Sequence, residues 1–323
     1  MSETVVIMSK VLVHETNTEH AEWLKHFFVE NQLVGLKASS VLENLNMNID
    51  LGALFLCESP DKSGGHINEL VVQIHKTRRE LPIFLRIHDQ TDEAQLTEDI
   101  RNACAGIYKT SDREQLKDWI QTYIFQREYP ASFIRNMMQI SDNAFQACFP
   151  GMIINCASPP YLVRDRLISG ELFSMISLET SWCRGYLMVQ TQVSQMLKLI
   201  EKGKTIQPSD DLTKYNVNSL ISELTNMIWG GFKNKFINDE NVVLGVHRSE
   251  IPIVINHEGN YISFGSVKPQ LCLHYILQAP DGNIPAISIY EKLVFSLDWN
   301  LEKFQEPVEQ QTVAVEEFSI ELF

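Results

Sequence analysis

The first 126 residues alternate short apolar runs with amphipathic stretches, and this alternation constrains the fold more than any other feature of the chain. The runs have the length of strands, and the stretches between them place apolar residues at helical spacing. A repeated strand–helix order predicts a parallel sheet covered by helices on both faces. We expect strands over 10–13, 50–57, 82–87 and 105–108, and helices over 18–28, 66–81 and 112–125.

This order of elements resembles a response-regulator receiver, and Lys109 resembles the lysine that ends the receiver's fifth strand. The other receiver positions depart from the family. His14 and Glu15 stand where the resemblance implies an acidic pair that binds metal. Cys57 and Glu58 stand where it implies the aspartate that accepts the phosphoryl group. With one acid in place of two, the magnesium site is weakened, so we expect a receiver-like fold that is not phosphorylated.

Two interpretations of this degenerate receiver site remain open. Arg86 and Ile87 replace the small hydroxyl residue that normally ends the fourth strand. In one interpretation, Glu58 substitutes electrostatically for a phosphorylated aspartate and forms an ion pair with Lys109, which fixes one conformation. In the other, Glu58 and Lys109 are charges at the edges of loops, and Cys57 is a small buried hydrophobic residue.

A second domain is expected after Arg127–Pro130, where a proline follows a charged stretch. Its pattern predicts long helices packed on an antiparallel sheet. The helices cover 131–149, 192–200 and 210–236, and the strands cover 167–179, 181–191, 251–255, 261–267, 270–279 and 285–295. The predicted organisation is therefore an α/β domain over 1–127, an α+β domain over 128–300 and an acidic tail over 301–323. The tail is either a docking peptide or a last strand.

The helix expected over 210–236 carries three polar residues on an otherwise apolar background: Ser219, Glu223 and Asn226. At about 3.6 residues per turn these positions stack above one another, so that a carboxylate and a carboxamide reach the same side. An ordinary solvated helix face gives the same short pattern. Gly230 and Gly231 follow; they permit either close approach to another backbone or a kink.

The run Ser219, Glu223, Asn226 and Met227, with Pro252 before a later strand, resembles the signature of the CheX/CheC/FliY phosphatases. These proteins remove the phosphoryl group from the aspartate of response-regulator receivers. The interval from Asn226 to Pro252 is a few residues longer than in the family. A second copy of the Glu-x-x-Asn pattern is absent from the helix over 131–149, so the resemblance implies one site per chain, as in CheX.

The resemblance also implies how the site works. Asn226 orients the attacking water, and Glu223 docks the lysine of the bound receiver. Ser219 and Pro252 contribute binding contacts. The chain needs no cofactor of its own, since the phosphorylated receiver supplies Mg²⁺. A homodimer formed through the sheet is implied as well. The alternative is a signalling adaptor that binds receivers through the same helix without hydrolysis.

The composition of the chain limits the classes of partner that we expect. The net charge of −14 argues against nucleic acid, whose phosphates attract lysine and arginine patches. No apolar run approaches the roughly 18 residues of a membrane span, and no signal peptide is visible at the start, so we expect a cytoplasmic protein. The six cysteines are scattered without a C-x-x-C pair, which indicates reduced thiols. The histidines are equally dispersed, and no metal site is expected.

Overall fold

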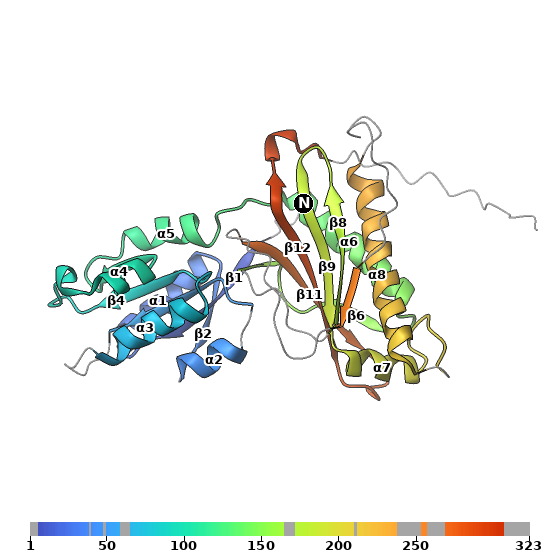
Figure 1. Cartoon of the computed structure of the whole chain (residues 1–323), viewed down its shortest axis with the longest axis horizontal. Coiled ribbons are helices and arrows are strands. Elements are labelled where there is room, and N and C mark those ends of the chain that lie inside the picture. The colour runs from blue at the N-terminus through green and yellow to red at the C-terminus, as the bar shows by residue number, and fades with distance from the viewer. Residues whose placement is uncertain are drawn as a thin grey trace, which may run out of the picture.

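The structure is a computed structural model that describes residues 6–38, 40–47, 50–58, 65–164, 172–209, 212–237, 253–256 and 269–306. In these residues the strands form one 12-stranded sheet whose main path runs β10-β8-β9-β12-β11-β7-β1-β3-β4-β5. The first half of the chain contributes parallel pairs, and the second half contributes antiparallel pairs (Figure 1). None of the described helices is both long enough and apolar enough to cross a membrane.

The first half alternates strands and helices as predicted. Its strands pair in the order β2-β1-β3-β4-β5, all parallel, which is the order of flavodoxin-like and receiver domains. The receiver-like fold is therefore confirmed. The elements are β1 (Met8–His14), α1 (Thr18–Glu30), β2 (Leu33–Lys37), α2 (Val41–Met47), β3 (Ala53–Cys57), α3 (Gly65–Thr77), β4 (Ile83–Ile87), a 3-10 turn (Glu93–Gln95), α4 (Glu98–Ala103), β5 (Gly106–Lys109) and α5 (Gln115–Tyr123).

Strands β3 and β4 are buried along their whole length, because helices cover both faces of the sheet. Side chains alternate between the faces with the period of a strand. Leu54 and Leu56 pack into a cluster with residues of α3, whereas Phe55 packs with residues of α1 and α5. An apolar run without polar interruption is thus the sequence signal of a strand buried on two sides.

The second half places helices against an antiparallel sheet. Helices α6 and α8 share a buried cluster with one face of the sheet, and α8 runs beside β8 and β9 (Figure 1). The elements are α6 (Ala131–Cys148), β6 (Ile153–Cys156), β7 (Tyr161–Val163), β8 (Leu172–Glu179), β9 (Cys183–Thr191), α7 (Val193–Glu201), α8 (Lys214–Phe236), β10 (Ile253–Asn256), β11 (Gln270–Gln278), β12 (Ile287–Trp299) and a 3-10 turn (Leu301–Lys303). The strand predicted over 261–267 and the tail after 306 lie outside the described residues.

One short strand joins the two halves. Strand β7 pairs antiparallel with β11 and parallel with β1, where Ser9 lies opposite Leu162. The Ser9 hydroxyl donates to the Leu162 carbonyl oxygen at 3.3 Å, and the Met8 backbone N donates to the Pro160 oxygen at 2.9 Å. A Cβ on Gly52 would lie 2.0 Å from the Ser9 oxygen, so a larger residue there would push the Ser9 hydroxyl out of this bond. The two halves therefore share backbone hydrogen bonds as well as a linker.

Candidate functional site

Helix α8 carries the polar stripe predicted from the sequence. It begins after Thr213, whose side-chain oxygen accepts a hydrogen bond from the Asn216 backbone N at 3.3 Å. This cap satisfies one of the donors left free at a helix start. Leu220, Leu224 and Ile228 are fully buried against the sheet and α6. The opposite side of α8 is therefore left for polar residues.

Ser219, Glu223 and Asn226 occupy the other side of α8. Ser219 and Glu223 are half-buried, and Asn226 is exposed. In the part of the chain that the structure describes, none of these side chains forms an internal hydrogen bond or ion pair. Residues three apart on a helix have Cβ atoms roughly 5–6 Å apart, so Glu223 and Asn226 can engage neighbouring groups of one ligand. The structure therefore leaves a carboxylate and a carboxamide available together.

Glu223 lies at the edge of this polar stripe, close enough to α6 to act on Cys148. Burial, with a smaller contribution from the Glu223 carboxylate, raises the pKa of the Cys148 thiol on α6 to about 12. The Cys148 sulfur also lies 3.7 Å from the sulfur of Met227. This thiol stays protonated and is not a nucleophile near the stripe.

The two glycines of α8 have different surroundings. A Cβ on Gly231 would lie 2.5 Å from Cγ2 of Ile140 on α6, whereas a Cβ on Gly230 would meet nothing within 4 Å. Gly231 thus permits the close packing of α6 against α8, and Gly230 faces open space. Pro252 lies outside the described residues, and β10 begins directly after it at Ile253.

A second polar site lies at the carboxyl ends of the parallel strands. Arg86 on β4 donates to both Glu15 oxygens, from Nε at 2.7 Å and from Nη2 at 2.6 Å. Their side chains are only 2 % and 4 % exposed. Arg86 Nη1 also donates to Thr110 Oγ1 at 3.1 Å. Burial alone would raise the pKa of Glu15, but the hydrogen bonds and charge of Arg86 outweigh it and lower that pKa.

Glu58 and Lys109, which one interpretation pairs with each other, have separate partners in the structure. Glu58 Oε2 accepts from the His88 backbone N and from Thr91 Oγ1, both at 2.8 Å. Lys109 Nζ donates to the Asp89 carbonyl oxygen at 3.3 Å. The ion pair that the first interpretation requires is therefore absent from the described residues. The second interpretation, two charges at loop edges, requires no such pair.

The remaining degenerate receiver positions hold structural contacts. Cys57 is 1 % exposed, its sulfur lies 3.5 Å from Thr16 Oγ1, and burial raises its pKa. His14 Nδ1 lies 3.3 Å from the Ala38 carbonyl oxygen. Within the described residues no three His, Cys, Asp or Glu side chains gather closely enough to hold a metal ion. The side chains at this site thus have contacts within the chain.

Sequence reasoning missed two residues of this cluster as interacting groups. Arg86 was identified as a replacement, but its pairing with Glu15 was not foreseen. A signal existed, because a charged residue at the end of a buried strand needs an opposite charge. His20 was not identified. It is buried, its Nε2 lies 3.1 Å from the Tyr108 hydroxyl, and burial lowers its pKa to about 4, so it is neutral at pH 7.

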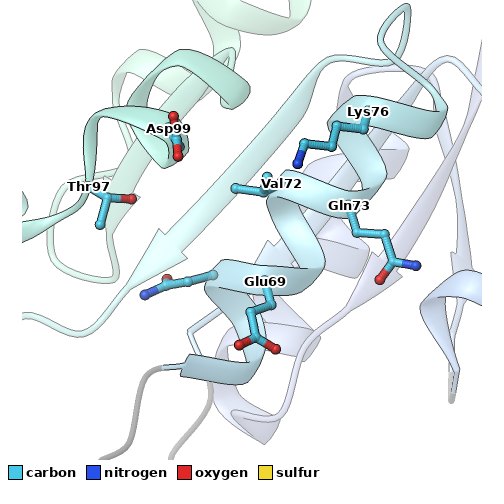
Figure 2. A pocket seen from close by; sticks show the side chains of 7 residues that line it. Glu69, Val72, Gln73, Lys76, Thr97 and Asp99 are labelled. Atoms are coloured by element: carbon cyan, nitrogen blue, oxygen red, sulfur yellow. The ribbon is translucent and has the colours of Figure 1, made fainter.

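An open cleft of 420 Å³ lies elsewhere, between α3 and the start of α4 (Figure 2). It contains none of the residues predicted to act. It is lined by Asn68, Glu69, Val72, Gln73, Lys76, Thr97 and Asp99.

Comparisons with known proteins return solved structures alone: neither a family model nor a curated protein matches the sequence. One similar structure is a response regulator receiver domain protein from Clostridium thermocellum, with 14 % identity and a TM-score of 0.32 over 37 % of this chain and 96 % of that chain. Another is RcsB from Salmonella enterica, with 14 % identity and a TM-score of 0.30 over 42 % of this chain and 79 % of that chain. Full-length FixJ from B. japonicum shows 9 % identity and a TM-score of 0.32 over 70 % of this chain and 98 % of that chain.

Proposed function

We propose that this protein removes the phosphoryl group from the aspartyl phosphate of a response-regulator receiver. The observation that carries the proposal is the outer side of α8, where Glu223 and the exposed Asn226 have no internal partner in the described residues. The helix itself is held firmly, because Leu220, Leu224 and Ile228 are fully buried. A rigid helix that presents unpaired polar groups suits insertion into a partner's site.

Helix α8 has to supply only a few of the groups that this reaction needs. Aspartyl phosphates are labile, and the receiver itself supplies Mg²⁺ and a lysine around the phosphoryl group. The phosphatase has to place a water in line with the bond that breaks. The Asn226 carboxamide can donate to a phosphoryl oxygen and accept from the water. A carboxylate at this position would repel the phosphoryl group, so an uncharged side chain is the better choice.

Glu223 contributes binding in this proposal. Its carboxylate pairs with the receiver's lysine, and docking of the two proteins removes water from the pair. A desolvated, charge-assisted contact contributes roughly 1.5–3 kcal/mol, against about 0–1 kcal/mol for an exposed pair. Ser219 lies one turn earlier and contributes a close contact. No histidine side chain bonds to it in the described residues, so it is not an activated nucleophile.

An adaptor without hydrolysis is the second candidate. The observation that favours it is the Arg86–Glu15 pair, which occupies the degenerate receiver site with the chain's own side chains. This chain therefore already contains one module without its family's chemistry. An adaptor would use α8 for binding alone.

The decay of radiolabelled phospho-receivers from the same organism tests the proposal. Catalytic amounts of the protein should accelerate loss of label from a cognate receiver through many turnovers. Binding of a phospho-receiver without faster decay would support the adaptor instead. Neither binding nor faster decay with any receiver would contradict both candidates.

We also propose a homodimer built by the second half. The β7 side of its sheet is occupied by β1 of the same chain, so sheet pairing between copies must use another edge. Light scattering on the full chain should give twice 37.0 kDa, and a monomer at micromolar concentration would contradict the dimer.

A further inference from the structure

The first turn of α8 carries an aromatic side chain that the fold does not use. Tyr215 is 77 % exposed, and among the described residues it is the one aromatic side chain with large exposure. Its ring stacks on no other ring, and its hydroxyl has no hydrogen-bond partner in the described part of the chain. Tyrosine is also a poorer helix former than alanine, leucine or lysine. Neither packing nor helix formation therefore accounts for Tyr215.

Tyr215 lies on the same stripe as the candidate site. Positions 215, 219, 223, 226 and 230 follow the spacing of one helix face. Going outward from Asn226, the stripe reaches Tyr215 at one end and Gly230, which faces open space, at the other. With a rise of about 1.5 Å per residue, Tyr215 lies roughly 16 Å from Asn226 and roughly 22 Å from Gly230 along the axis.

These lengths fit a small globular domain. A domain of about 100 residues has a radius of gyration near 13 Å, so its surface spans the whole stripe at once. A domain whose phosphoryl group meets Asn226 would therefore place its outer surface over Tyr215. Large aromatic side chains with an apolar body and a polar tip are the most frequent strong contributors to such interfaces.

We propose that Tyr215 is a docking residue for the phosphorylated receiver, which extends the function proposed above and depends on it. Tyr215 contacts an apolar patch on the receiver away from the phosphoryl group, while Glu223 and Asn226 engage the site itself. Because of its distance from Asn226, Tyr215 contributes to affinity and not to the chemical step.

The test uses the full chain and the phosphorylated receiver that the wild-type protein binds most tightly. Tyr215→Ala should weaken its binding roughly 30-fold, the effect of a strong interface aromatic, and raise KM while leaving kcat unchanged. Tyr215→Phe should retain most of the affinity. Val29→Ala is the matched control, since Val29 is 81 % exposed on α1 in the other half of the chain.

The possible results separate the docking role of Tyr215 from the proposed phosphatase activity. Unchanged affinity of Tyr215→Ala for a receiver that the wild type hydrolyses would overturn the assignment and leave the phosphatase proposal standing. Binding lost in Tyr215→Ala, with no hydrolysis by the wild type, would keep the docking role and overturn the phosphatase. A change in the mass of Tyr215→Ala by light scattering, with receiver affinity unchanged, would assign Tyr215 to a contact between copies and overturn the proposal.

Discussion

Arg86 and Glu15 form a buried ion pair at the carboxyl ends of the parallel strands. The guanidinium donates to both carboxylate oxygens, and both side chains are almost fully buried. Pairing of this kind holds each charge inside the protein at the cost of removing both from water. The charges at this end of the sheet are thus satisfied within the chain.

The stability of the protein should depend on this pair. Arg86→Met should lower the free energy of unfolding by about 3–5 kcal/mol, because it leaves the Glu15 carboxylate buried without its partner. Glu15→Gln combined with Arg86→Met should recover much of the loss. Urea unfolding measures both changes. Lys25→Met, in the exposed Glu22–Lys25 pair, is the control and should leave the midpoint unchanged. A similarly small effect of Arg86→Met would contradict the account.

The stability of the protein should depend on pH through Glu291. It is fully buried on β12, where Ser141 Oγ of α6 donates to it at 2.6 Å, and burial raises its pKa to about 8. A carboxyl group whose pKa is higher in the folded state favours folding while it is protonated. Its contribution is complete below the ordinary pKa of 4.5 and is lost as pH rises through 8.

The urea midpoint of the wild type should therefore fall between pH 6 and pH 9. Glu291→Gln keeps an acceptor for Ser141 but does not ionise, so its midpoint should fall less over the same range. Parallel curves for the two proteins would show that Glu291 does not carry this pH dependence.

At the scale of elements, the contact of α6 with α8 depends on Gly231 but not on its neighbour Gly230. Gly231→Ala should destabilise the protein by about 1–3 kcal/mol, since the new Cβ would lie 2.5 Å from Ile140 Cγ2. Gly230→Ala meets open space and removes a poor helix former, so it should stabilise by up to about 1 kcal/mol. Thermal unfolding of the two variants measures the contrast, and equal effects would contradict it.

The long elements could be predicted from the sequence because each carries its own apolar pattern. The helices expected over 131–149 and 210–236 are present as α6 and α8. Strand β7 was missed, since three residues are too short to show a period and its partners, β1 and β11, lie far away in the sequence. Helices α2 and α4 were missed because they are short, and strands β2 and β6 because most of their side chains are exposed or half-buried.

Some contacts at the candidate sites could be predicted from the sequence and others could not. The stripe of Ser219, Glu223 and Asn226 is local in sequence, so helix geometry alone placed its members together. The contact of Arg86 with Glu15 joins residues 71 positions apart, and it follows from the register of the parallel strands. Patterns along the chain predict the first kind of site and miss the second.

At the scale of the whole molecule, the shared sheet makes the two halves one unit. Strand β7 bonds to β1 on one side and to β11 on the other. Scanning calorimetry on the full chain should therefore show a single transition, with the two halves losing structure together. Two separated transitions would show that the junction at β7 does not couple them.

The central claim is that Asn226 acts in the chemical step on a bound receiver. The most direct measurement is single-turnover loss of label from a saturating phospho-receiver, with affinity measured alongside. Asn226→Ala should abolish the stimulated dephosphorylation while receiver affinity stays nearly intact, because the lost contacts form mainly in the transition state. Asn234→Ala, an exposed asparagine on the same helix, should behave as the wild type. Wild-type turnover by Asn226→Ala with normal binding would contradict the proposed mechanism.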